Sequence, residues 1–207
     1  RYLGAVQAVK EGYDLIILDD GLQDKTLFKN LNIVCFNEKQ LSGNGLTLPS
    51  GPLRESLNSL KKYQIVIINS TKNDKLEKFE KKIKNISNKI NIYYSKYVPD
   101  PLKIKKFNDK KVLSFAGIGN PKNFFDLLEN NKLNIVRKIS FPDHYNYSKN
   151  EIENLIILAK KEDLQIITTE KDYLRIKKFQ FKEIDYLPVS LKIHDEDLLI
   201  KEIKKIL

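Results

Sequence analysis

The sequence predicts an α/β fold in two parts, and two observations support this. Residues 15–18 and 65–68 form short, unbroken apolar runs, and these runs and the mainly apolar run 112–116 alternate with segments of helical spacing. Unbroken runs are typical of strands buried on both faces of a parallel sheet. Pro99 and Pro101, with charged neighbours, separate two such alternations. We therefore expect a first domain over 1–98, a linker over 99–107 and a smaller α/β domain over 108–207.

The first part contains helical spacing over 2–11, which Gly12 would terminate. Strands are expected at 15–18, 31–36, 65–69 and 92–97, and a Lys- and Glu-rich helix at 74–90. The segment 42–56 is rich in Gly, Pro and Ser, which predicts a long loop of the kind that is usually functional or disordered.

The second part alternates more regularly between the two patterns. Its expected strands cover 112–116, 135–140, 165–169 and 186–189, and its expected helices cover 122–129, 149–160, 172–178 and 195–206. Loops 117–121 and 141–148 follow the first two of these strands.

The net charge of +10 comes from 37 Lys and Arg against 27 Asp and Glu. This excess suits nucleic acid, an anionic membrane surface or a phosphorylated substrate, and a lysine-rich solvated surface explains it equally well. No apolar run reaches the length of a bilayer span, and no signal peptide precedes the first strand. Cys35 is the one cysteine, so no disulfide can form within the chain, and we expect this thiol to be reduced and buried.

Asp19 and Asp20 directly follow the apolar run 15–18. Acids at the carboxyl end of a buried strand have the form of a Walker B element, which holds Mg²⁺ against nucleotide phosphates. Alternatively, the two acids only open a turn before Gly21. The usual partner of a Walker B element, G-x-x-x-x-G-K-[ST], is absent from the 207 residues.

Three further groups of residues have chemical potential. Arg54 and Glu55 end the long loop, and an arginine fork suits phosphate, although a surface ion pair is the alternative. His144 follows an expected strand, and its imidazole could accept the proton of a hydroxyl or orient the group that does. The remaining candidates would contact substrate or line a cleft, and the alternative is that they simply form turns and helix caps: Gly117, Gly119, Asn120, Asp143, Glu170, Lys171 and Asp172.

Five motifs together resemble the tetraacyldisaccharide 4'-kinase family, which phosphorylates the disaccharide precursor of lipid A. Asp19-Asp20-Gly21-Leu22-Gln23 is similar to the family's DDGLQ signature, although Asp24 stands where the family usually has histidine. The later motifs follow in family order: Gly43-Asn44-Gly45 with Leu48-Pro49-Ser50-Gly51-Pro52-Leu53-Arg54-Glu55, Phe115-Ala116-Gly117-Ile118-Gly119-Asn120-Pro121, Phe141-Pro142-Asp143-His144 and Thr168-Thr169-Glu170-Lys171-Asp172.

The resemblance implies a P-loop NTPase-like parallel sheet, here incomplete, because the family's phosphate-binding loop, its membrane-associating helix and a catalytic aspartate precede the equivalent of Arg1. The absence of methionine also suggests a fragment, which we expect to be inactive alone.

The implied reaction transfers the γ-phosphate of ATP to the 4'-hydroxyl of an acylated glucosamine disaccharide 1-phosphate. Asp19 and Asp20 would bind Mg²⁺, Gln23, Arg54 and Glu55 would bind the nucleotide, and Asp20 and His144 would be catalytic.

The implied location is the cytoplasmic face of the bacterial inner membrane, where lysines would contact anionic lipid. Two alternatives remain open. The chain could be an inactive remnant of such a kinase, or a basic module that binds nucleic acid or an anionic surface. Dispersed lysines and the lack of an RNA-binding signature speak against nucleic acid.

Overall fold

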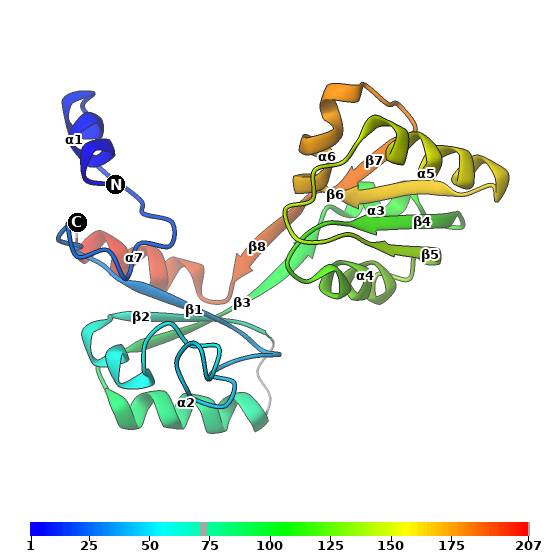
Figure 1. Ribbon diagram of the computed structural model, residues 1–207. Coiled ribbons are helices and arrows are strands. Elements are labelled where there is room, and N and C mark those ends of the chain that lie inside the picture. The colour runs from blue at the N-terminus through cyan, green and yellow to red at the C-terminus, as the bar shows by residue number, and fades with distance from the viewer. Residues whose placement is uncertain (71–73, 207) are drawn as a thin grey trace. The chain divides into compact units, whose positions relative to one another are not determined.

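A computed structural model describes residues 1–70 and 74–206 (Figure 1). The chain divides into two compact units. Unit 1 contains Arg1–Lys96 and Lys192–Leu207, and unit 2 contains Tyr97–Leu191. The C-terminal segment therefore belongs to the first unit and not, as expected, to a second domain over 108–207. The expected linker 99–107 instead contains the end of strand β3 (Asn91–Pro99) and helix α3 (Pro101–Lys106).

Unit 1 is built on a sheet of strand order β1-β2-β3-β8. β1 (Ile33–Asn37), β2 (Ile65–Asn69) and β3 are parallel, with Ile33 opposite Ile65 and Ile65 opposite Asn91. β8 (Val189–Ile193) runs antiparallel to β3, since the N–H of His194 donates to Tyr94 and that of Asp100 to Pro188. This strand was not expected. Pro188 separates it from β7 (Ile184–Leu187), where we expected one strand over 186–189.

Helices cover both faces of this sheet (Figure 1). Val66 and Ile68 of β2 pack with α2 (Asp74–Ile86) and the 3₁₀ helix η1 (Leu57–Lys62). Ile65 and Ile67 point to the other face and pack with α7 (Glu196–Ile206) through Leu199. The unbroken apolar run of β2 is therefore explained by burial on both faces.

The N-terminal part of unit 1 departs from the prediction. Helix α1 (Tyr2–Lys10) forms as expected, and Gly12, at φ 82°, ends it in a Schellman arrangement. The expected strand over 15–18 is wrong: within the described residues no strand pairs with it, and Ile17 is 85% exposed. An extended segment becomes a strand only when a neighbour accepts its hydrogen bonds. The buried environment predicted for Cys35 is also wrong, because this residue is exposed on the edge strand β1.

Unit 2 contains a fully parallel sheet of order β5-β4-β6-β7. Its other strands are β4 (Lys111–Ala116), β5 (Asn134–Ser140) and β6 (Gln165–Thr169). Leu113 and Phe115 pack with α5 (Lys149–Lys161) on one face, and Val112 and Ala116 pack with α4 (Pro121–Asn130) on the other. The short helices α6 (Glu170–Ile176) and η2 (Lys177–Phe179) follow β6.

None of the helices in the described parts of the chain combines the length and the apolar character that crossing a bilayer requires.

Candidate functional site

Three loops of unit 2 converge where three parallel strands end. Gly117 follows β4, Asp143 and His144 follow β5, and Asp172 lies in α6, directly after β6. Ligands of open α/β sheets bind outside the carboxyl ends of the strands. We name Gly117, His144, Asp172 and Arg175 the histidine cluster.

Asp172 is the buried anchor of the histidine cluster, with a side chain 0% exposed. One carboxylate oxygen accepts the N–H of Gly117 at 2.9 Å and the hydroxyl of Thr169 at 2.7 Å. The other accepts from Arg175 Nη1 at 3.0 Å. A buried carboxylate is tolerated only when it is paired and hydrogen-bonded, so these contacts fix the loop after β4 against α6.

Arg175 was not predicted from the sequence. Its Nη1 also donates to the carbonyl of Gly117 at 2.9 Å, and its Nη2 lies 3.1 Å from Nδ1 of His144. The available signal was its position three residues after Asp172, which places both side chains on the same helix face.

His144 has a left-handed backbone, with φ 58°. This conformation is costly for a residue with a Cβ, and such strain is concentrated at functional sites. The carboxylate of Asp143 accepts the backbone N–H of His144 at 2.9 Å and lies 3.9 Å from its Nε2, beyond hydrogen-bond range. The side chain of His144 is 71% exposed and available to a ligand.

The two glycines after β4 allow close approach. A Cβ at position 117 would lie 2.6 Å from the hydroxyl of Tyr147, and one at position 119 would lie 3.3 Å from Asp143 Oδ2. Burial, together with the neighbouring carboxylate of Asp172, raises the pKa of Tyr147 above its ordinary value. The structure thus brings Gly117, Gly119, Asp143, His144 and Asp172 together.

The other unit 2 candidates have ordinary structural explanations. Asn120 caps α4 by accepting the N–H of Asn123 at 3.4 Å, and Pro121 occupies the first helical position. Glu170 and Lys171 are exposed in the first turn of α6.

Unit 1 brings together a second group of candidates. Nη1 of Arg54 contacts both carboxylate oxygens of Asp20 at 2.6 Å, and both side chains are more than half exposed. Hydrogen bonding from Arg54 lowers the pKa of Asp20 below its ordinary value. Asp20 itself is held at φ 52° in the turn before Gly21.

Glu55 lies beside this pair and accepts from Gln23 at 3.3 Å and from the hydroxyl of Tyr63 at 3.1 Å. Burial alone would raise its pKa, but hydrogen bonds from Ser59, Tyr63 and Gln23 hold it below the ordinary value. Tyr63 is a further contact that sequence reasoning missed. Asp24 accepts from the backbone and hydroxyl of Thr26 at 2.8 and 2.6 Å, so it stabilises the turn.

The acids of unit 1 fit a metal ion only in part. Within the described residues there is no group of three or more His, Cys, Asp or Glu that could hold a metal. Mg²⁺, however, usually takes one or two carboxylates and completes its shell with phosphates and water. Asp19 is exposed, and no described group bonds its carboxylate, whereas both carboxylate oxygens of Asp20 contact Arg54. Arg54 therefore competes with a metal ion for the carboxylate of Asp20.

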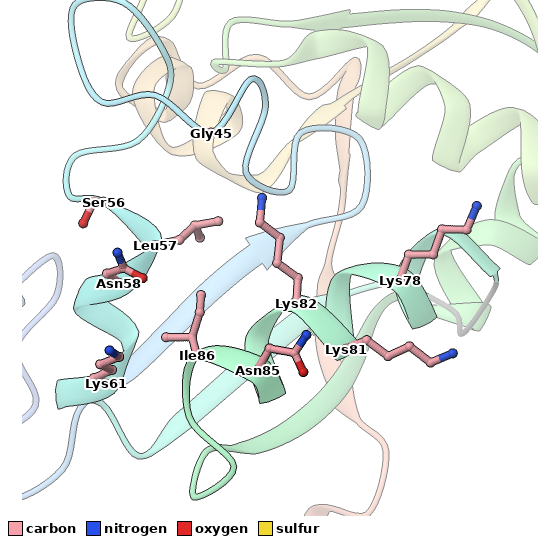
Figure 2. Close-up of a pocket in the computed structure, with 10 residues that line it drawn as sticks. All are labelled: Gly45, Ser56, Leu57, Asn58, Lys61, Lys78, Lys81, Lys82, Asn85 and Ile86. Atoms are coloured by element: carbon pink, nitrogen blue, oxygen red, sulfur yellow. The ribbon is translucent and has the colours of Figure 1, made fainter.

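A lysine-rich groove of about 620 Å³ lies between η1 and α2 (Figure 2). Lys78, Lys81 and Lys82 extend from α2, and Lys61 lies on η1, with the loop that carries Gly45 above them. Among the side chains that the structure describes, those of residues 1–70 and 76–206, none forms an ion pair with any of these four lysines. We name Lys61, Lys78, Lys81 and Lys82 the lysine groove. Like charges three and four residues apart repel each other, so an anion in this groove would be stabilised.

The fold and the histidine cluster define an α/β protein with a candidate ligand site at the carboxyl edge of a parallel sheet. The model of the tetraacyldisaccharide-1-P 4'-kinase (LpxK) family matches residues 1–207, and the chain belongs to this family.

Curated relatives carry the same name. The chain is 48% identical to the tetraacyldisaccharide 4'-kinase of Pelagibacter ubique over 201 residues, which are 97% of this chain and 63% of that protein. It is 37% identical to the Rickettsia akari kinase over 93% of this chain and 57% of that protein. A crystal structure of LpxK from Aquifex aeolicus, described as an apo form in complex with ATP, has the same fold. The TM-score is 0.70 at 23% identity, covering 99% of this chain and 62% of the other. The chain thus spans about three fifths of its relatives' length.

Proposed function

We propose that this chain forms the larger part of an ATP-dependent kinase that phosphorylates the 4'-hydroxyl of an acylated glucosamine disaccharide 1-phosphate. The observation that carries the proposal is the family match over the whole chain. The relatives' names supply the acceptor, and the Aquifex aeolicus crystal structure with ATP supports the choice of nucleotide.

The unit 1 group is suited to nucleotide binding. Arg54, Gln23 and Glu55 lie together, and the guanidinium already contacts an anionic group, the carboxylate of Asp20. A phosphate would offer Arg54 the same charge-assisted hydrogen bonds. Asp19 and Asp20 would hold Mg²⁺, which when bound neutralises charge on the phosphates. In this proposal Arg54 would leave Asp20 and donate to the phosphates of the nucleotide.

The histidine cluster is suited to the acceptor. Phosphoryl transfer depends on positioning the attacking hydroxyl and on moving its proton. His144 is exposed and fixed by Arg175 at a sheet edge where ligands bind. Gly117, Gly119 and Asp143 would shape the space next to its ring. The acid at Asp20 would contribute to catalysis through the metal.

The lysine groove is suited to an anionic bilayer at the cytoplasmic face of the inner membrane, where an acylated substrate resides. Each lysine near such a surface contributes about 1 kcal/mol of attraction. Four lysines line this one groove, none with a described ion-pair partner, which supports this partner.

A chimaera tests the proposed reaction. This chain would replace the matched 63% of the Pelagibacter ubique kinase, so that the relative supplies the rest. Purified chimaera, ATP, Mg²⁺ and the acylated disaccharide 1-phosphate should yield a product heavier by one phosphate, with the new group on the 4'-oxygen. A folded chimaera that forms no such product, beside an active parent enzyme, would favour an inactive remnant.

A further inference from the structure

We propose that Arg175 is a positioning residue that holds the His144 ring with Nδ1 as a hydrogen-bond acceptor and the proton on Nε2. The inference rests on the proposed function, because the role of the ring in the reaction depends on it. The geometry that carries it is internal to unit 2.

The chemistry of the contact decides the tautomer. Nη2 of Arg175 lies 3.1 Å from Nδ1 of His144. A guanidinium has only donors, so Nδ1 must be the acceptor and cannot carry a proton in this contact. In the neutral imidazole the single proton then lies on Nε2. Nε2 is 3.9 Å from Asp143, which is too far for a hydrogen bond, and the ring is 71% exposed. The Nε2–H group is therefore available to a ligand.

Arg175 is itself held rigidly. Its Nη1 donates to Gly117 O at 2.9 Å and to Asp172 Oδ1 at 3.0 Å, and Asp172 is completely buried. The other oxygen of Asp172 accepts from Gly117 N and from Thr169. Residues at the ends of β4 and β6 thus fix the donor that orients a side chain at the end of β5. Such supporting contacts set the tautomer and direction of a functional histidine.

This arrangement favours one of the two roles considered for His144. An imidazole that carries its proton on Nε2 cannot accept another proton there, and Nδ1 is occupied by Arg175. His144 therefore donates from Nε2 to an oxygen of the acceptor, or of the group that deprotonates it, and orients that oxygen. In the reaction Arg175 acts only through His144.

Nuclear magnetic resonance of the 207-residue chain tests the tautomer without any assay of activity. The chain contains two histidines, so selective ¹⁵N-histidine labelling gives two ring systems, and His194→Gln assigns the remaining one to His144. Above the ordinary titration range of histidine, long-range ¹H–¹⁵N spectra should show Nδ1 unprotonated and Nε2 protonated. A spectrum with the proton on Nδ1 would overturn the proposal.

The Arg175→Lys variant tests whether Arg175 sets the tautomer of His144. A lysine keeps a positive charge beside buried Asp172, but a single ammonium cannot bond both Asp172 and His144 as the planar fork does. We expect the His144 ring signals to shift toward a mixture of tautomers. The matched control is Arg137→Lys, since Arg137 forms a two-nitrogen pair with Glu162 in the same unit, away from His144. Equal spectra for wild type and a folded Arg175→Lys protein would contradict a positioning role.

The same substitution in the chimaera connects the contact to catalysis. Arg175→Lys should lower kcat by roughly tenfold to a hundredfold with the KM for ATP unchanged, because only the acceptor's orientation is affected. An unchanged kcat would overturn the inference that the contact between Arg175 and His144 matters for the reaction. A chimaera that is inactive with an intact Nε2–H tautomer would instead defeat the proposed reaction, so the two failures are distinguishable.

Discussion

Gly117 shows how closely individual residues are packed in the histidine cluster. Its N–H and its carbonyl are both hydrogen-bonded by side chains of α6. A Cβ there would meet Tyr147 Oη at 2.6 Å and both Asp172 Oδ1 and Tyr145 Cβ at 3.2 Å. Only glycine satisfies these distances without a shift of its neighbours.

Gly117→Ala should destabilise unit 2 by about 1–3 kcal/mol, the usual cost of overpacking. Gly119→Ala is the matched control, because its nearest contact would be the exposed carboxylate of Asp143 at 3.3 Å. Chemical denaturation of the two variants measures the difference. Tyr147→Phe should recover part of the loss, since it removes the atom closest to the new methyl group. Equal stability of the two glycine variants would show that the loop after β4 adapts freely.

Candidate residues that follow strands could be predicted from the sequence. Asp143, His144 and Asp172 each lie three or four residues after the end of a strand, and parallel strands bring their carboxyl ends together. Arg175 could not be found in this way. A single arginine in a short helix is indistinguishable from a surface residue until the fold shows its contacts.

At the scale of elements, α7 determines which unit the C-terminus joins. Leu199 is 4% exposed and packs on Ile65 and Ile67 of β2, whereas neighbouring Leu198 is 56% exposed. Tyr93 of β3 reinforces the docking by donating to Glu202 of α7 at 2.7 Å. The helix is therefore part of the core of unit 1.

Leu199→Ala should lower the stability of unit 1 by about 2–4 kcal/mol, because the shorter side chain leaves a cavity between α7 and β2. Leu198→Ala is the matched control and should change stability by no more than about 0.5 kcal/mol. Hydrogen exchange followed by mass spectrometry locates the effect. Loss of protection confined to residues 97–191 would contradict the assignment of α7.

The same contact predicts an alkaline dependence of stability. Burial and the hydrogen bond to Glu202 raise the pKa of Tyr93 to about 12, and burial and Glu80 raise that of Tyr94 to about 12. The unfolded chain titrates near the ordinary value of about 10. The two tyrosines therefore stabilise the folded state below about pH 10, and this stabilisation is lost as the pH rises toward about 12. Between these pH values, the melting temperature of the double variant Tyr93→Phe, Tyr94→Phe should fall less steeply with pH than that of wild type. Equal slopes of melting temperature against pH would contradict this role of the two tyrosines.

The pattern of elements was largely predictable, because runs rich in apolar and β-branched residues marked β2, β4 and β6 and the capping residue Asn120 marked the start of α4. The expected strand over 15–18 failed, since apolarity predicts burial only where the fold provides a covering surface. The division of the chain could not be predicted either. The C-terminal segment joins unit 1 because β8 pairs with β3, about a hundred residues earlier in the chain, and no local sequence pattern predicts such a distant pairing.

For the whole molecule, the net charge is +10, and four of the 37 Lys and Arg line the lysine groove. Changing its four lysines to glutamine should weaken binding to anionic phospholipid vesicles by up to about a thousandfold, since each contributes about 1 kcal/mol and about 1.4 kcal/mol is a factor of ten. The matched control changes four exposed unit 2 lysines to glutamine: Lys110, Lys111, Lys161 and Lys182. Vesicle sedimentation at low and high salt measures the binding. Equal loss in both variants would show that only net charge matters.

We propose that the loop after β5 provides the functional histidine of a phosphoryl-transfer enzyme. The most direct test compares His144→Ala with His194→Ala in the chimaera, since His194 is 80% exposed in unit 1 and belongs to neither candidate site. Transfer of labelled phosphate from ATP to the acylated disaccharide would be measured under saturating substrates. We predict that His144→Ala lowers kcat by roughly 10²- to 10⁴-fold, with ATP affinity retained, and that His194→Ala leaves kcat unchanged. A His144→Ala protein with normal kcat and a reduced melting temperature would contradict the claim and leave the histidine a purely structural role.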